Sequence, residues 1–545
     1  MYKGNTFFTS KPDSVKIILY QDAFEVVNPL GSAKRKHKIL AVYMTLADIF
    51  PHNRSNVDHM QLVLLCRESD FKTFGHAKVF SRLLTDLKQL EEDGVTVANG
   101  QTLCATVLCI VGDNLGSHCI GGFTENFSFS EHFCRYCNIA RTDFVCKPYS
   151  LGEPRTKESY DCDAIIAETE DRLVHGIKFT SVFNELNYFH VCQPGLPPCL
   201  DHDLFEGVVS YDMALCIKHF VKTKKWFSYA ELNRLVSQFK YHGSDSRNKP
   251  NEISAGGAKI GGHAAQNWCL LRLIPLILAG RIVDYDDAVW QLLLQLREIV
   301  CIVCAPAVTP GQVAYLNVVT EDYIDMRATL FPDSRIKPKH HYMAHYAELI
   351  LLFGPLIRLW TMRFESKHCY FKKCARSVSN FRHSLAERHQ LLQAYLSAGD
   401  IFRPEVQCDQ GIPFFEDTYT IAIQNAVMPM CFSSDDTVLT TTITVKGTSY
   451  KKGLYVPLEY TDAGILFGEL VIVLKRFSDQ VFFVVQPVRT VFDANIGAYS
   501  ITEKVASLSC IAHHSLLDYY PLPAYSIKGT LVIPLHHAVI DKAEH

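Results

Sequence analysis

A continuous apolar run, TLCATVLCIV from Thr102 to Val111, most constrains the fold of this chain. A strand that is apolar on both faces belongs inside a sheet and usually runs parallel to a neighbour. Three earlier segments rich in Val, Ile, Leu and Tyr predict strands at 15–21, 39–46 and 60–66, and apolar residues at helical spacing predict a helix over 80–90. This order predicts an antiparallel meander, a crossover helix and a parallel strand beside the first.

Two aspartates follow the first and last of these strands. Asp22 ends VKIILYQD, and Asp113 ends LCATVLCIVGD. Neighbouring parallel strands end at one edge of a sheet, so the two carboxylates are expected close together. The same order of elements opens the ribonuclease H fold, which we therefore expect.

A third acid, Glu365, lies in LWTMRFESKHCYFKK, within a predicted helix. Three clustered carboxylates repel one another, but they can hold two Mg²⁺ or Mn²⁺ ions for phosphodiester chemistry. Taken alone, each acid is more often a turn aspartate or a helix-surface glutamate, and the joint context favours the metal site.

Periodicity divides the chain into four predicted regions within an α/β fold. Residues 1–146 would be the first part of a ribonuclease H-like core, and 147–335 a linker followed by a large all-helical insertion. Residues 336–403 would complete the core, and 404–545, where apolar residues alternate, a small β-rich domain.

Composition restricts the class of protein. With 545 residues, 48% apolar and 20% charged, the chain can form a large core. Its longest apolar run, CLLRLIPLILAGRIV, is too short for a membrane span and predicts a buried helix, and the N-terminus has no secretory signal pattern. No membrane partner is expected.

Charge gives a mixed indication of nucleic-acid binding. The net charge of −3 does not favour it, but the stretch 335–376 holds nine Lys/Arg against two carboxylates, with aromatic residues interleaved. A solvated helix face would have the same composition. The basic cluster Lys34, Arg35, Lys36 and Lys38 is open to three interpretations, as a DNA contact, a nuclear-import signal or a solubilising turn.

Most of the 19 cysteines are expected to be buried thiols, but Cys134-Arg-Tyr-Cys137 has the spacing of a zinc ligand pair. We expect His340 and His345 to complete a structural Cys2His2 zinc site, with His341 as the substitute for His340, because His341 and His345 share a helix face. The alternatives are buried thiols in a turn for the cysteines, and a surface position or contact with DNA phosphates for the histidines.

Four ordered motifs make the chain resemble the transposases of CACTA (EnSpm) elements, particularly animal copies, over residues 15 to 400. They are LYQDAFEVVNPLGS, VGDNLGSHCIGGF followed by HFCRYC, PPCLDHDLFEGVV, and KPKHHYMAHYAELILLFGPLIRLWTMRFESKH. The resemblance implies catalytic, metal-binding roles for Asp22, Asp113 and Glu365. The family's Cys-x-x-His motif matches Cys199 and His202. The expected zinc arrangement is similar to that of the recombination-activating nuclease of antigen-receptor gene assembly.

The resemblance implies a DDE-type DNA transposase that cuts transposon ends and joins them to target DNA in the nucleus, as a homodimer or higher oligomer. Arg363, Lys367, His368 and Trp360 are candidate DNA contacts, with a core tryptophan as the alternative for Trp360. Asp22 lies so near the start that the upstream DNA-binding module of a complete transposase is expected to be missing. The alternatives are a catalytically inactive, transposase-derived scaffold that binds DNA or protein, and a cellular ribonuclease H-like nuclease.

Overall fold

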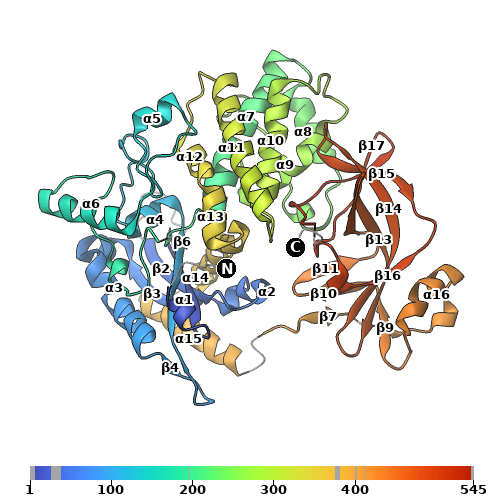
Figure 1. Ribbon diagram of the computed structural model, residues 1–545, viewed down its shortest axis with the longest axis horizontal. Helices are drawn as coiled ribbons and strands as arrows, with labels where there is room; N and C mark the ends of the chain where they lie inside the picture. Colours follow the sequence, from blue (N-terminus) through green and yellow to red (C-terminus); the bar gives the residue numbers. More distant parts are fainter. Residues whose placement is uncertain are drawn as a thin grey trace. The chain divides into compact units, whose positions relative to one another are not determined.

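The chain forms two compact units, each containing helices and strands (Figure 1). The computed structural model describes residues 6–25, 38–193, 195–374, 381–398, 402–409 and 411–541. Unit 1 comprises Met1–Val208 and Val313–Arg403, and unit 2 comprises Val209–Gln312 and Pro404–His545. Among the described helices, none has the length and apolar character needed to cross a bilayer.

A four-stranded mixed sheet forms the centre of unit 1, in the order β3-β2-β1-β6. β1 (Val15–Glu25) pairs antiparallel with β2 (Lys38–Leu46), which pairs antiparallel with β3 (Gln61–Arg67). β6 (Ala105–Gly112) lies parallel to β1 on its other side. The predicted meander and parallel fourth strand are thus confirmed.

The expectation that Asp22 ends the first strand is wrong, because β1 continues to Glu25. The parallel ladder with β6 stops at Gln21 and Gly112, but the antiparallel ladder with β2 continues and pairs Asp22 with Ala41. Asp22 is therefore the first residue beyond the parallel pairing. The basic cluster at 34–36 lies outside the described residues, and Lys38 begins β2.

Alternation along β1 and β2 fills two cores, one on each face of the sheet. On one face, Ile17 and Leu19 pack with Phe80 and Leu84 of the crossover helix α3 (Glu68–Glu92), which is kinked at Gly75, where φ is 73°. On the other face the cluster contains Tyr20 and Tyr43 of the strands and Leu359, Phe364, Phe371 and Leu385 of the C-terminal helical segment of unit 1. The sheet is thus covered by helices from both ends of the unit.

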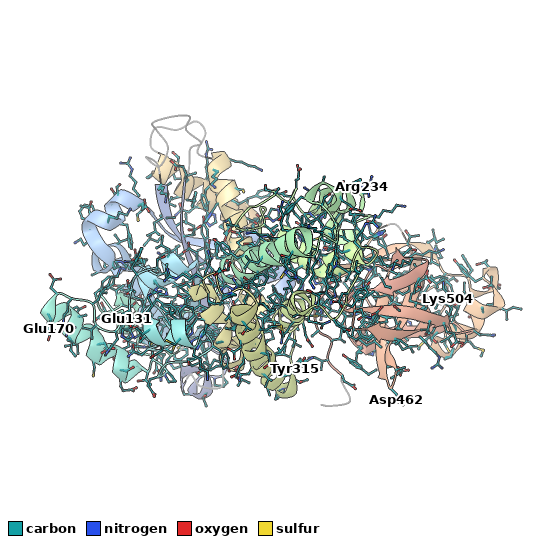
Figure 2. The ribbon with its side chains drawn as sticks, turned by 90° about the horizontal axis from the view of Figure 1, so that it is seen from above. Glu131, Glu170, Arg234, Tyr315, Asp462 and Lys504 are labelled. Carbon is teal, nitrogen blue, oxygen red and sulfur yellow. The ribbon has the colours of Figure 1, made fainter. Side chains whose placement is uncertain are left out.

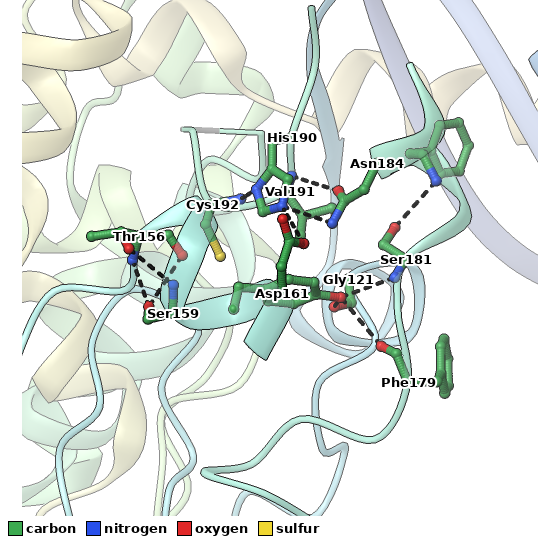
Figure 3. A network of polar contacts seen from close by, with 12 residues as sticks. Gly121, Thr156, Ser159, Asp161, Phe179, Ser181, Asn184, His190, Val191 and Cys192 are labelled. Atoms are coloured by element: carbon green, nitrogen blue, oxygen red, sulfur yellow. Dashed lines mark hydrogen bonds and ion pairs between the residues drawn. The ribbon is translucent and has the colours of Figure 1, made fainter. Parts of the chain in front are cut away.

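The segment after β6 is fixed by a polar network (Figure 3). The Tyr160 hydroxyl of α6 (Lys157–Glu170) donates to Gly121 O over 2.8 Å and accepts from Ser181 N at 3.0 Å. Asn184 Oδ1 accepts from Val191 N, and the His190 ring lies 3.2 Å from Asp161 Oδ1. These bonds hold residues 179–192 against the end of α4 (Asn114–Ile120).

The remaining α-helices and strands described in unit 1 are short, apart from α11, α14 and α15. They are α1 (Thr6–Ser10), α2 (Pro51–Arg54), β4 (Val95–Thr96), β5 (Thr102–Leu103), α5 (Arg141–Cys146), α11 (Pro310–Leu330), α12 (Pro338–Ala344), α13 (Tyr346–Phe353), α14 (Met362–Cys374) and α15 (Phe381–Ser397). α11 begins in the last residues of the unit 2 segment.

Unit 2 combines helices of the segment 209–312 with the C-terminal strands. The α-helices described in this segment before α11 are α7 (Ser210–Lys218), α8 (Tyr229–Gln238), α9 (Ala264–Leu278) and α10 (Ala288–Val303). α9 is buried on nearly all sides, as its apolar sequence predicts, and its Arg272 is paired with the buried Asp245. Both charges of this pair are buried, so removal of either side chain would leave the other charge uncompensated.

The strands of unit 2 form a nine-stranded sheet and a three-stranded sheet. Their bounds are β7 (Val406–Cys408), β8 (Ile412–Pro413), β9 (Thr437–Thr440), β10 (Thr442–Val445), β11 (Thr448–Lys451), β12 (Tyr455–Thr461), β13 (Gly464–Arg476), β14 (Val481–Asp493), β15 (Ala498–Lys504), β16 (Ser509–Ala512), β17 (Tyr525–Ile527) and β18 (Thr530–Ile533), with the helix α16 (Ile421–Val427) before β9. Lys504, labelled in Figure 2, ends β15 and donates to Glu469 of β13 over 2.9 Å.

The two units group the chain differently from the four predicted regions. Residues 147–208, predicted as linker and insertion, lie in unit 1, where Phe183, Leu186 and Phe189 join the core beside the sheet and Gly195 O accepts from Ile110 N. The C-terminal β region shares unit 2 with the inserted helices, as in the bond from Trp290 Nε1 to Asn495 O at 3.1 Å.

Candidate metal centre and carboxylate site

Four buried side chains of unit 1 form a group that can hold a metal ion. The ligand atoms of Cys134, Cys137, His341 and His345 all lie within 4.8 Å of one another. Cys134 Sγ is 3.5 Å from His345 Nε2, Cys137 Sγ is 3.3 Å from His341 Nε2, and the two Nε2 atoms are 3.2 Å apart. The cysteines come from the irregular segment between α4 and α5, and the histidines from α12 and its C-terminal end.

The donor set fits zinc. Tetrahedral Zn²⁺, with bonds of about 2.05 Å to nitrogen and 2.3 Å to sulfur, spaces its ligand atoms by roughly 3.3 to 3.8 Å. Two imidazole nitrogens that face each other beside two sulfurs present several lone pairs to one point, which a cation satisfies. The Cys134 thiol and the histidine rings hold the pKa of Cys137 well below its usual range, whereas burial raises the pKa of Cys134. The arrangement thus supports one ligand already in the thiolate form.

The choice of His340 as a ligand is wrong, and its substitute His341 takes the place. His340 is the third residue of α12, and its Nδ1 accepts from the backbone N–H of Lys337 at 3.2 Å, so it caps the helix start. His341 and His345 are four positions apart and lie on one side of the helix, with rings 4.9 Å apart. Helix geometry therefore selects the i, i+4 pair.

The two aspartates lie beside each other at the end of the parallel ladder. β1 and β6 pair up to Gln21 and Gly112, and Asp22 and Asp113 are the next residues on each strand. Asp113 caps α4, and its Oδ1 accepts from Gly116 N over 2.6 Å. Asp22 Oδ1 accepts from Ala23 N at 2.7 Å, which leaves Oδ2 toward Tyr20 and His368.

Helix α14 carries Glu365 to the same sheet. Phe364 stacks on Tyr20 of β1 at 4.8 Å between ring centroids, and His368 stacks on Phe24 at 4.2 Å. Glu365 lies between these two anchors along the helix. The structure thereby brings Glu365 to the strand that carries Asp22, which lies 343 positions earlier in the sequence.

Electrostatics links the three acids. Burial, followed by the charges of Asp113 and Glu365, raises the pKa of Asp22 to about 6. Burial and the charges of Glu206 and Asp113 raise the pKa of Glu365. Among the described residues, however, the three carboxylates do not converge as tightly as the four ligands of the Cys2His2 group. A cation between them would lower both pKa values.

The Cys199-x-x-His202 motif lies close to Glu365. His202 Nδ1 is 3.2 Å from Cys199 Sγ and 4.0 Å from Glu365 Oε1. The motif starts the irregular helix Asp201–Val209, whose first residue, Asp201, is buried and accepts from the Thr361 hydroxyl at 2.9 Å. Burial, with the charge of Glu365 adding to it, raises the pKa of Asp201 to about 7.

The candidate DNA contacts differ in exposure. Arg363 is exposed, whereas Lys367 is buried and donates to Val57 O at 2.7 Å, and burial lowers its pKa to about 8. His368 is buried against β1, and burial lowers its pKa to about 3. Trp360 packs 5.9 Å from Phe205. Only Arg363 of these four is placed for contact with an external phosphate.

Sequence reasoning did not single out Arg135, Asn114, Asp201, Asp203 or Thr361, all of which hold the site together. The available signal was adjacency, since each of the five lies directly beside a predicted site residue. No family model matches the chain, and no curated protein matches it.

Proposed function

We propose that unit 1 is the catalytic unit of a DDE-type DNA transposase, which cleaves DNA at transposon ends and joins the freed ends to target DNA. The observation that carries the proposal is the pairing of β1 with β6, which sets Asp22 beside Asp113, together with the stacking of α14 on β1, which adds Glu365. The charges of the other two acids contribute to the raised pKa of Asp22, as expected of a site that accepts cations.

The strand order supports a ribonuclease H-like core. The order β3-β2-β1-β6, with a crossover helix before β6, is the opening topology of that fold. The four motifs that resemble CACTA transposases all fall within residues 15 to 400, and Asp22, Asp113 and Glu365 lie on the elements where that family has its acids. DNA partners, an oligomer and a nuclear location are parts of the same proposal.

In this proposal Asp22, Asp113 and Glu365 hold two Mg²⁺ or Mn²⁺ ions through carboxylate oxygens, the ligands that such ions prefer. The ions supply activation of the attacking oxygen and stabilisation of the leaving oxygen. Asp113 is oriented by its capping bond to Gly116 N, and Asp22 by its bond from Ala23 N. The exposed Arg363, two residues before Glu365, contacts a flanking phosphate.

Nicking of supercoiled plasmid in the presence of Mn²⁺ tests the proposal. Wild-type protein is expected to nick the plasmid, Glu365→Gln to lose nicking, and Glu348→Gln, which changes an exposed glutamate of α13, to retain it. Each variant is first checked for zinc content and thermal stability. Equal nicking by wild type and Glu365→Gln, or no nicking by any folded protein, would contradict the proposal.

One observation favours a second candidate, a non-catalytic scaffold derived from such a transposase. His368 Nδ1 lies 3.6 Å from Asp22 Oδ2, and His202 Nδ1 lies 4.0 Å from Glu365 Oε1, so two of the acids each have a histidine neighbour. A scaffold is expected to bind DNA equally well as wild type and as Glu365→Gln. Neither protein is then expected to nick DNA.

A further inference from the structure

The turn that carries the two cysteines also holds a buried arginine directed at the carboxylate site. Arg135 stands between Cys134 and Cys137 and is 3% exposed. Its guanidinium lies over the rings of Tyr136 and Tyr342, and its Nη1 donates to Asn114 Oδ1 over 2.7 Å. Asn114 directly follows Asp113, so this bond fixes the peptide that carries the second carboxylate.

The contact continues beyond Asn114. Its Nδ2 donates to Oδ1 of Asp203, a fully buried residue. The second oxygen of Asp203 accepts from Cys199 N at 3.2 Å, and Asp203 N donates to Cys199 O at 2.8 Å. Asp203 thus closes the turn that sets His202 beside Cys199 and Glu365.

The far end of this chain of bonds reaches the start of α14. The Thr361 hydroxyl contacts both Cys199 Sγ, at 3.1 Å, and Asp201 Oδ2, while Thr361 O accepts from Glu365 N at 3.1 Å. One series of buried polar contacts therefore runs from the Cys-x-x-Cys turn past Asp113 to the helix of Glu365. A shift of this turn is therefore expected to move both Asp113 and Glu365.

We propose that Arg135, Asn114 and Asp203 are positioning residues that set the separation of Asp113 and Glu365, and so couple the divalent-cation affinity of the carboxylates to the Cys2His2 centre. This inference rests on the proposed function. Residues that orient metal ligands typically change metal affinity by about 10- to 100-fold when altered. Asn114 is the donor and Asp203 the acceptor of one hydrogen bond, and mutation can exchange the two side chains.

A reciprocal exchange of Asn114 and Asp203 tests the proposal in full-length, zinc-loaded protein, with Mn²⁺ binding followed by electron paramagnetic resonance. Asn114→Asp sets two carboxylates against each other, and Mn²⁺ affinity is expected to fall by about tenfold. The added charge alone would instead tighten cation binding, so the direction of change separates positioning from electrostatics. In the double variant Asn114→Asp/Asp203→Asn, residue 203 donates to residue 114, Arg135 keeps its acceptor, and affinity is expected to return.

Arg135→Lys, which keeps the charge but loses the forked geometry, is expected to weaken Mn²⁺ binding. The matched control is Arg141→Lys, since the Arg141 guanidinium of the same segment donates to the carbonyls of Ser130 and Phe127, and it is expected to bind Mn²⁺ normally. Unchanged or tighter binding by Asn114→Asp, or no recovery in a zinc-loaded double variant, overturns the coupling alone. If the wild-type protein has no Mn²⁺ binding that is lost in Asp22→Asn, both this inference and the proposed function are overturned.

Discussion

Thr361 and Asp201 are 160 positions apart in the chain and share a buried hydrogen bond of 2.9 Å, in which the threonine hydroxyl donates to the carboxylate. Both side chains are at most 3% exposed. The other oxygen of Asp201 has no hydrogen-bond partner among the described residues, so this carboxylate depends strongly on the Thr361 hydroxyl.

Replacing Thr361 by Val is expected to lower the free energy of unfolding by about 1–3 kcal/mol, because it leaves a buried carboxylate with one acceptor bond fewer. Thr361→Ser keeps the hydroxyl and is the control. Since the pKa of Asp201 is raised to about 7, its carboxylate is mostly neutral at pH 5 and mostly charged at pH 8. The loss measured by urea unfolding is therefore expected to be larger at pH 8, and an equal loss at both pH values would contradict the argument.

The identity of the second histidine in the Cys2His2 group is open to direct measurement. His341→Gln is expected to abolish stoichiometric zinc in purified protein, because His341 Nε2 contacts Cys137 Sγ and His345 Nε2. His340→Gln is the neighbouring control and is expected to keep its zinc, since His340 caps α12 instead. Elemental analysis distinguishes the two, and loss of zinc from His340→Gln alone would reverse the assignment.

Unit 1 is expected to lose stability in acid through His389. Its Nε2 accepts from Leu62 N over 3.0 Å, and burial lowers its pKa to about 4 from the ordinary 6.5. The unfolded chain binds the proton first, so this contribution to stability is complete above pH 6.5 and is lost as the pH falls toward 4.

His389→Gln keeps an acceptor for Leu62 and is expected to reduce the slope of stability against pH in that interval. His383→Gln is the matched control on the same helix, because His383 is exposed and pairs with Glu387 at 3.2 Å. Chemical unfolding at several pH values gives both slopes. The assignment fails if His383→Gln changes the slope as much as His389→Gln.

Unit 2 contains a buried ion pair and a more exposed one that can be compared. Arg272→Met leaves the buried Asp245 carboxylate without its cation and is expected to cost about 3–5 kcal/mol. Arg281→Met removes the partly exposed pair with Glu231 and is expected to cost about 0–1 kcal/mol. Thermal unfolding of both variants checks the difference, and similar losses would show that burial of the Arg272 pair has no special weight.

The strands of unit 1 could be predicted because their apolar residues alternate with polar ones or form a continuous run. This pattern depends only on which faces of the sheet are buried. The two aspartates followed from the same pattern. His341 could not be separated from His340 by composition, since the choice depends on which ring faces the cysteines and which caps the helix. Adjacency to His202 and Trp360 marks Asp201 and Thr361, but their hydrogen bond could not be predicted because it joins segments 160 residues apart. Phe183, Leu186 and Phe189 pack in the core beside the sheet but have no helical period, so periodicity does not indicate where they pack.

The ligand pairs of unit 1 are also separated in time during synthesis. Cys134 leaves the ribosome long before His345, which lies 211 positions later, and the intervening chain includes residues 209–312 of the other unit. The thiols and the two aspartates in the first 208 residues therefore lack their histidine and glutamate neighbours until residues 313–403 are synthesised. A metal ion bound by the Cys2His2 group at that moment would close a loop of more than 200 residues, so metal supply during translation is expected to set the yield of folded protein.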